Sequence, residues 1–178
     1  MRALFPDNTV LCNFAAVGRL DLLRDFLRGR GRWVEAVAEE ARASARHLPI
    51  LAGVHREGWL GEAIAIDDPD DIAGVERLRR HVFGGSAHEP RKHLGESQTC
   101  HVIVNWASFA GSVWISDDQA SIRYAQARGI TAWETIHILS AIVADGDMSA
   151  QDAYDLMLDM ADHDRHLTLP DHPRDLTL

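Results

Sequence analysis

Short apolar runs alternate with helical stretches along the whole of this 178-residue chain, and this alternation is what most constrains its fold. The apolar runs occupy residues 3–5, 33–34, 62–66 and 112–116, and each is followed by residues with helical character. Strands separated by helices predict a parallel sheet that helices cover on both faces. We therefore expect an α/β protein, a three-layer α/β/α sandwich with a short central parallel sheet.

The helical stretches account for most of the remaining residues. Glu96 opens one expected helix, and Ser149 is suited to the N-cap position of the last expected helix. The Gly-, Pro- and His-rich residues 84–93 predict a loop. The other expected helices span residues 9–29, 34–47, 72–85, 119–129, 135–146 and 149–164.

Length and composition point to one soluble domain over residues 1–178. No apolar stretch approaches the ~20 residues of a membrane helix, and the N-terminus lacks a signal-peptide pattern. We expect a cytoplasmic protein that does not contact a membrane, with Cys12 and Cys100 as buried thiols. The net charge of −9 argues against a broad nucleic-acid-coating surface but leaves room for a local one, because the arginines cluster.

Acidic residues mark the ends of the expected strands. Asp7 follows the first strand by two residues, and Asp117 and Asp118 come directly after another strand. Glu96 opens the helix that leads into that strand, and Glu40 lies about one and a half turns into the helix after residues 33–34. Ligands of open parallel sheets bind at the carboxyl ends of the strands. These carboxylates are therefore expected to converge on one pocket.

Converging carboxylates repel one another, and a divalent cation would compensate for that repulsion. Hard oxygen ligands suit Mg²⁺ or Mn²⁺. Because the sequence contains no dedicated nucleophile motif, the chemistry expected of such a site is attack by a metal-activated water on phosphate. The alternative is that these residues serve helix termini and solvent: Asp7 and Asp117 as N-caps, and Glu40 as a solvated side chain.

Four sequence blocks resemble the PIN domain, the small α/β nuclease fold of VapC-type toxins. FPDNTVLCNFAAVGRLDLL at residues 5–23 is similar to the opening of the family, and WVEAVAEEARAS at 33–44 to its second block. HLGESQTCHVIVNWA at 93–107 resembles its Leu-Gly-Glu block. VWISDDQASIRYAQARGI at 113–130 resembles its strand-plus-aspartate block. The order of the four blocks is more specific than any one of them.

The resemblance implies a single PIN-like nuclease domain that acts as a Mg²⁺- or Mn²⁺-dependent endoribonuclease. The family's metal-binding and catalytic carboxylates map onto Asp7, Glu40, Glu96 and either Asp117 or Asp118. Asp118 is favoured because it falls where the family has its aspartate after a Thr-Asn pair. The family also implies an RNA substrate, a role as the toxin of a toxin–antitoxin pair, an antitoxin protein as partner, and a homodimer that uses the two C-terminal helices.

Several positions depart from the family pattern. Asn8 stands where Thr or Ser is more common, although Thr9 offers a hydroxyl beside Asp7. Gln98 replaces a second acidic residue. Glu39 competes with Glu40 for the pocket, since neighbouring helical residues point about 100° apart. Asn8 and Gln98 favour an alternative function, a catalytically eroded PIN-like domain that binds RNA or protein without cutting.

Three further features bear on ligands and partners. Arg91 or Arg123 is expected to bind phosphates that flank the scissile bond. Residues 47–93 form a middle segment longer than in the shortest PIN toxins, and this segment would shape the choice of substrate or partner. The sequence does not separate a structure-specific DNA nuclease from a ribonuclease.

Overall fold

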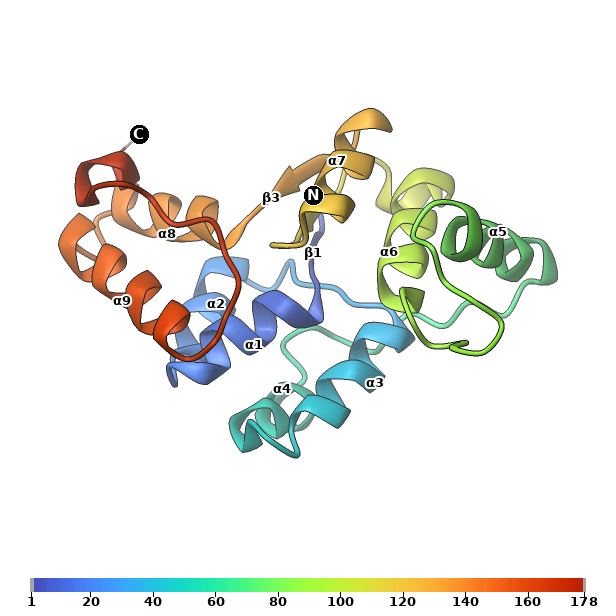
Figure 1. The fold of residues 1–178 in the computed structure, drawn as a ribbon, viewed down its shortest axis with the longest axis horizontal. Helices are drawn as coiled ribbons and strands as arrows, with labels where there is room; N and C mark the ends of the chain where they lie inside the picture. The colour runs from blue at the N-terminus through green and yellow to red at the C-terminus, as the bar shows by residue number, and fades with distance from the viewer. Residues whose placement is uncertain (1, 178) are drawn as a thin grey trace.

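The computed structural model describes residues 2–177 and shows a mixed α/β protein. Three parallel strands form its sheet in the order β1 (Leu4–Pro6), β2 (Val113–Ile115) and β3 (Thr131–Trp133). In Figure 1 the strands lie near the centre, with α8 and α9 on one side, and α5 and α6 on the other. The α/β class expected from the alternation of apolar runs and helices is confirmed.

Two of the expected strands are reduced to one parallel bridge that they make with each other, between Val34 and Ile64. Gly31, just before the first of them, makes a parallel bridge with Leu4 of β1. The extended segment ends at Val34, because α3 begins at the next residue. The expected strands at 33–34 and 62–66 are therefore wrong as strands, although both segments lie where a sheet edge would place them.

Nine α-helices occur within residues 2–177, and the larger ones match the expected helical stretches. The expected helix over 9–29 is divided in two, because Gly18 adopts a left-handed conformation (φ 69°) between its halves. The short helix α4 was not expected. Ser149 is confirmed as an N-cap, since its side chain accepts a hydrogen bond from the Asp152 amide. The bounds are α1 Asn8–Ala16, α2 Leu20–Leu27, α3 Glu35–Ser44, α4 Ala52–Glu57, α5 Pro69–His81, α6 Leu94–Asn105, α7 Gln119–Ala127, α8 Thr135–Ala144 and α9 Ala150–Asp162.

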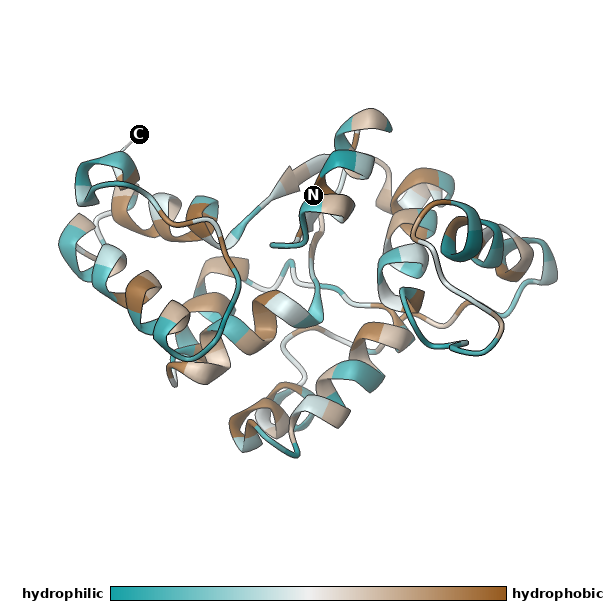
Figure 2. Cartoon of the chain, in the orientation of Figure 1, coloured by the Kyte–Doolittle hydropathy of each residue, from teal (hydrophilic) through white to brown (hydrophobic). Residues whose placement is uncertain are grey.

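One hydrophobic core extends from Leu4 to Leu176 and contains every residue of β2. Figure 2 shows hydrophobic residues concentrated in α8, whereas α5 is largely hydrophilic. Both cysteines are buried and free, as expected. Burial raises the pKa of Cys100 to about 11, so this thiol is a poor nucleophile at neutral pH. Within residues 2–177 no helix is both long and apolar enough to cross a membrane.

Candidate functional site

Asp7 lies where β1 ends and α1 begins, and it caps that helix. Its Oδ1 accepts hydrogen bonds from the Val10 amide at 2.9 Å and the Thr9 hydroxyl at 2.6 Å. The expectation that Thr9 supplies a hydroxyl beside Asp7 is confirmed. Burial raises the pKa of Asp7 to about 7, and the charge of Asp117 adds to that effect. Asp7 is thus both an N-cap and a buried carboxyl group that gains or loses a proton near neutral pH.

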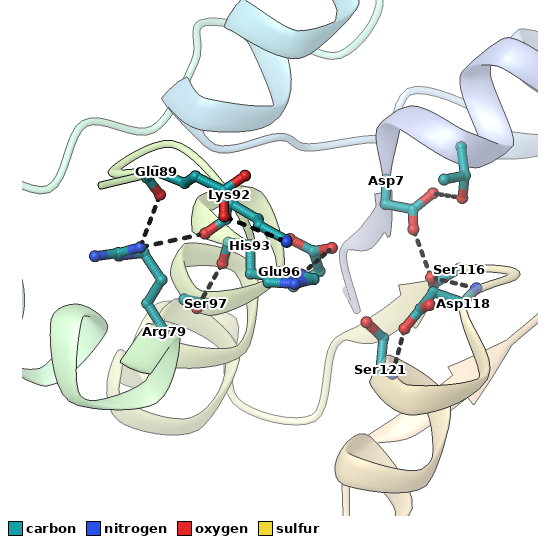
Figure 3. Close-up of polar contacts among 11 residues, drawn as sticks. Asp7, Arg79, Glu89, Lys92, His93, Glu96, Ser97, Ser116, Asp118 and Ser121 are labelled. Atoms are coloured by element: carbon teal, nitrogen blue, oxygen red, sulfur yellow. Dashed lines mark hydrogen bonds and ion pairs between the residues drawn. The ribbon is translucent and has the colours of Figure 1, made fainter. Parts of the chain in front are cut away.

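Ser116 links the carboxyl ends of β1 and β2. Its hydroxyl donates to Asp7 Oδ2 at 2.5 Å and accepts from the backbone amide of Asp118 at 3.1 Å. Asp118 is exposed and caps α7, its Oδ1 accepting from the Ser121 amide at 2.7 Å. One hydroxyl therefore fixes the position of Asp7 relative to the start of α7 (Figure 3).

Asp117 is buried and points away from solvent into a polar network. Its Oδ1 accepts from the Thr135 amide at 2.9 Å, and its Oδ2 accepts from the Thr135 hydroxyl at 2.5 Å and from Asn13 at 2.8 Å. Arg165, which follows α9, donates to the other side of Asn13 at 3.0 Å. Asp117 thereby joins β2, α1, α8 and the C-terminal segment. These three hydrogen bonds leave Asp118 the freer of the two candidates for a metal.

Glu40 lies half-buried on α3 against the start of α6. Its carboxylate oxygens are so close to Gly95 that a Cβ there would stand 3.0 Å from Oε1. Burial raises the pKa of Glu40 to about 8, and repulsion from Glu96 and Asp7 adds to the rise, while the Gly95 amide favours the ionised form. Glu39 is more exposed, and its Oε2 instead lies 3.7 Å from Nη2 of Arg91. Glu40 is therefore the residue of this pair that faces the other carboxylates.

Glu96 projects from the first turn of α6 toward the side of the sheet that carries Asp7 (Figure 3). His93 precedes that helix in a left-handed conformation (φ 61°), and its Nδ1 lies 3.5 Å from Glu96 Oε1. A non-glycine residue rarely adopts this conformation.

Asp7, Glu40 and Glu96 thus come from three separate elements, and the charges of Glu96 and Asp7 add to the effect of burial on the pKa of Glu40. Their hard oxygen atoms suit Mg²⁺ or Mn²⁺ in chemistry, and their mutual repulsion is what such an ion would relieve. As placed within residues 2–177, however, the His, Cys, Asp and Glu side chains form no group of three or more ready to hold a metal ion. A shared metal would require these carboxylates to close toward one another.

The arginine clusters have different roles. Arg79 is buried and cannot contact RNA, because its guanidinium bonds Glu76 and the carbonyl oxygens of Ser86 and Glu89. Arg91 has a side chain that is 83% exposed, and it lines a cavity of about 130 Å³ together with Glu40. Of the two phosphate-binding candidates, Arg91 is therefore beside the carboxylates. The other, Arg123, is exposed on α7.

The two departures from the family pattern have structural roles in this chain. Asn8 donates to the Ser44 hydroxyl at 3.1 Å and so connects α1 with α3. Gln98 accepts from the Ala36 amide at 3.0 Å and thereby satisfies a free backbone amide in the first turn of α3. Neither side chain is free to bind a ligand through those atoms.

Other sequence features serve capping and packing. Asp68 caps α5 by accepting from the amides of Asp70 and Asp71, so this run of aspartates serves the start of a helix. His163 follows α9, and its Nδ1 lies 2.8 Å from the carbonyl oxygen of Asp159. The Asn13–Asp117–Thr135 network was not predicted, because no local pattern signals pairings between residues 18 and 104 positions apart.

The fold and site define a mixed α/β protein whose parallel sheet carries Asp7, Asp117 and Asp118 at its carboxyl edge, with Glu40 and Glu96 on neighbouring helices. No family model, curated protein or solved structure matches this chain.

Proposed function

We propose that this chain is a Mg²⁺- or Mn²⁺-dependent endoribonuclease with a three-layer PIN-type fold, acting as the toxin of a toxin–antitoxin pair. The observation that carries this proposal is the raised pKa of Glu40, which burial produces and the charges of Glu96 and Asp7 increase. A carboxyl group whose pKa is raised in this way destabilises the fold when it ionises, unless a cation binds it. Such groups occur where function requires them.

Each residue has a distinct role in this proposal. The metal would be held by the carboxylates of Asp7, Glu40, Glu96 and Asp118. Asp117 would fix the carboxyl end of β2 through its buried hydrogen bonds. When bound, the metal activates a water molecule and neutralises charge on the scissile phosphate. Ser116 and Thr9 hold the carboxylate of Asp7 in one orientation.

Arg91 binds a phosphate next to the scissile bond. Its side chain is exposed to solvent and lines the same cavity as Glu40, so a phosphate bound by Arg91 would lie beside the carboxylates. Replacing Arg91 by Ala should weaken RNA binding and reduce its salt dependence by about one unit of slope. An antitoxin that presents an arginine or lysine to the same carboxylates would compete with the metal.

A second candidate function is binding of RNA or protein without cleavage. Two observations favour it: Asn8 and Gln98 serve structural hydrogen bonds, and the carboxylates within residues 2–177 are not gathered around a metal position. Metal-dependent thermal stabilisation distinguishes the two functions, since an intact carboxylate site gains stability from Mn²⁺ and an eroded one does not.

The deciding experiment is cleavage of a mixed RNA pool in Mn²⁺ by the native protein, Asp7→Asn and Glu96→Gln. Asp68→Asn is the matched control, because Asp68 caps a helix but lies outside the site. Cutting by native protein and the control, and none by the two site variants, supports the nuclease. An inert native protein, freed of any copurifying partner, refutes it. Single-stranded DNA assayed in parallel tests the specificity for RNA.

A further inference from the structure

A second cavity lies between α5, α6 and α7, toward the ends of α6 and α7 that are remote from the carboxylates (Figure 1). Its volume is about 430 Å³, and it shares no lining residue with the cavity beside Glu40. Asn105 and Arg128, at the ends of α6 and α7, line it. At about 1.5 Å of rise per residue, these ends lie roughly 13 to 15 Å along their helices from Glu96 and Asp118. The cavity is therefore separate from the carboxylate pocket.

The exposed charged groups of this cavity are basic. Arg77 and His81 come from α5, and Arg128 follows α7. Among the described residues the lining contains no Asp or Glu, although the chain as a whole carries a net charge of −9. Local positive charge on so acidic a chain favours an anionic ligand over a neutral one.

Arg128 is held in an orientation suited to binding an anion. Its Nε donates to the Tyr124 hydroxyl at 3.1 Å, and its guanidinium carbon lies 5.4 Å from the centre of the Tyr124 ring. Its two terminal nitrogens have no hydrogen-bond or ion-pair partner among residues 2–177. A planar guanidinium that is fixed through Nε can offer those nitrogens to two oxygens of one phosphate.

Other walls of the cavity are apolar. Leu78, Val82 and Val104 line it, and Val82 and Val104 are 40% and 50% exposed. The two valines belong to different helical segments, so they form an apolar patch rather than one isolated exposed side chain. Tyr124 adds an aromatic ring. A small inorganic anion would leave these walls in water, so the ligand that suits the cavity has an apolar or aromatic part as well as a charge.

Asn105 places a fixed polar group beside these apolar walls. Its Nδ2 lies 3.0 Å from the carbonyl oxygen and 3.2 Å from Nδ1 of His101. These contacts engage the amide nitrogen and orient Oδ1, which accepts no hydrogen bond from the side chains or backbone of residues 2–177. A free acceptor beside an apolar wall suits an N–H group on the edge of an aromatic ring, such as a nucleobase.

We propose that this cavity binds a nucleotide, either free or as one unit of an RNA chain. The base lies against Val82 and Val104, with an N–H group donating to Asn105 Oδ1. Arg77 and Arg128 bind the phosphate. The volume of the cavity lies in the range of small-molecule sites. The site is independent of the proposed nuclease, because no carboxylate group is among its described lining.

Calorimetric titration of the full chain in EDTA tests this site, with AMP, UMP and a short single-stranded oligoadenylate as probes. Arg77→Met and Arg128→Met keep an apolar stem without the charge, and each should weaken binding at least about tenfold. Tyr124→Phe keeps the ring but removes the acceptor for Arg128 Nε, so it should weaken binding about threefold or more. Arg56→Met is the matched control, because Arg56 is exposed on α4 outside the cavity.

The pattern of losses identifies the source of the nucleotide. If AMP or UMP binds and the two Met variants of the cavity lose affinity, the ligand is a free nucleotide; if only oligoadenylate shows this pattern, it is a unit of RNA. Circular dichroism confirms that each variant is folded. The proposal is overturned if no probe binds the native protein, if both cavity variants bind as the control does, or if inorganic phosphate binds as tightly as the nucleotides. Asp7→Asn should bind the probes as native protein does, so a failure of the nuclease proposal would be seen separately.

Discussion

Replacing Asp7 by Asn should make the metal-free protein more stable at alkaline pH. Burial raises the pKa of Asp7 from 3.8 to about 7. Below pH 3.8 the group is protonated in both folded and unfolded chains and has no effect. Between 3.8 and about 7 the unfolded chain ionises first, so stability falls as the pH rises, and above pH 7 the whole penalty is present.

The size of the effect follows from the two pKa values. The interval from 3.8 to about 7 corresponds to roughly 4 kcal/mol of stability lost by the native protein at high pH. Asn is as good an N-cap as Asp, so the cap at α1 survives. Refitting the hydrogen bond with Ser116 costs about 1 kcal/mol. As the pH rises from 4 to 8, the free energy of unfolding of Asp7→Asn should therefore increase by about 3 to 4 kcal/mol relative to that of the native protein.

Urea unfolding in EDTA at several pH values between 4 and 8 measures this difference. Asp68→Asn serves as the control, because it changes an exposed N-cap on α5. If the free energies of unfolding of native protein and Asp7→Asn differed by the same amount at every pH, the reasoning would be refuted. The pKa of Asp7 would then be the same in the folded and unfolded chains. Adding Mn²⁺ at pH 8 should reverse the order, because only the native carboxylate binds the ion well.

Three other predictions follow from neighbouring contacts. Thermal stabilisation by Mn²⁺ should grow as the pH rises from 6 to 8 and should be lost in Glu40→Gln, because burial raises the pKa of Glu40 to about 8 and a ligand must lose its proton. Gly95→Ala should also reduce Mn²⁺ stabilisation measured by calorimetry, because the new Cβ would press on Glu40. Arg79→Ala should cost about 3 kcal/mol or more in urea unfolding, since it removes a buried side chain together with its ion pair to Glu76 and its hydrogen bonds to the loop carbonyls, whereas Arg80→Ala should change stability by less than about 1 kcal/mol.

Local patterns in the sequence predicted the features that depend on neighbouring residues. The end of β1 at Asp7, the hydroxyl of Thr9 and the cap at Ser149 all involve partners within a few positions. The alternation of apolar runs and helices was enough for the α/β class. The choice of Glu40 over Glu39 needed the structure, because only the packing of α3 on Gly95 decides which glutamate faces inward.

Contacts between distant residues were beyond sequence reasoning. Arg79 stands in an arginine-rich stretch that reads as a solvated helix face, yet its side chain is only 2% exposed. Asp117 and Asp118 are chemically identical neighbours, and only Asn13 and Thr135 reveal that the first is engaged in the interior. Composition and spacing carry no information about such pairings.

The burial of Arg79 also determines the behaviour of the loop that carries Arg91 and His93. Its guanidinium donates to the carbonyl oxygens of Ser86 and Glu89, at two points along residues 84–93. A loop rich in Gly, Pro and His would otherwise sample many conformations and would have to be ordered whenever a ligand bound. Because Arg79 of α5 holds this loop through those hydrogen bonds, the loop becomes ordered when the chain folds. One wall of the carboxylate site is thus preorganised in the folded chain.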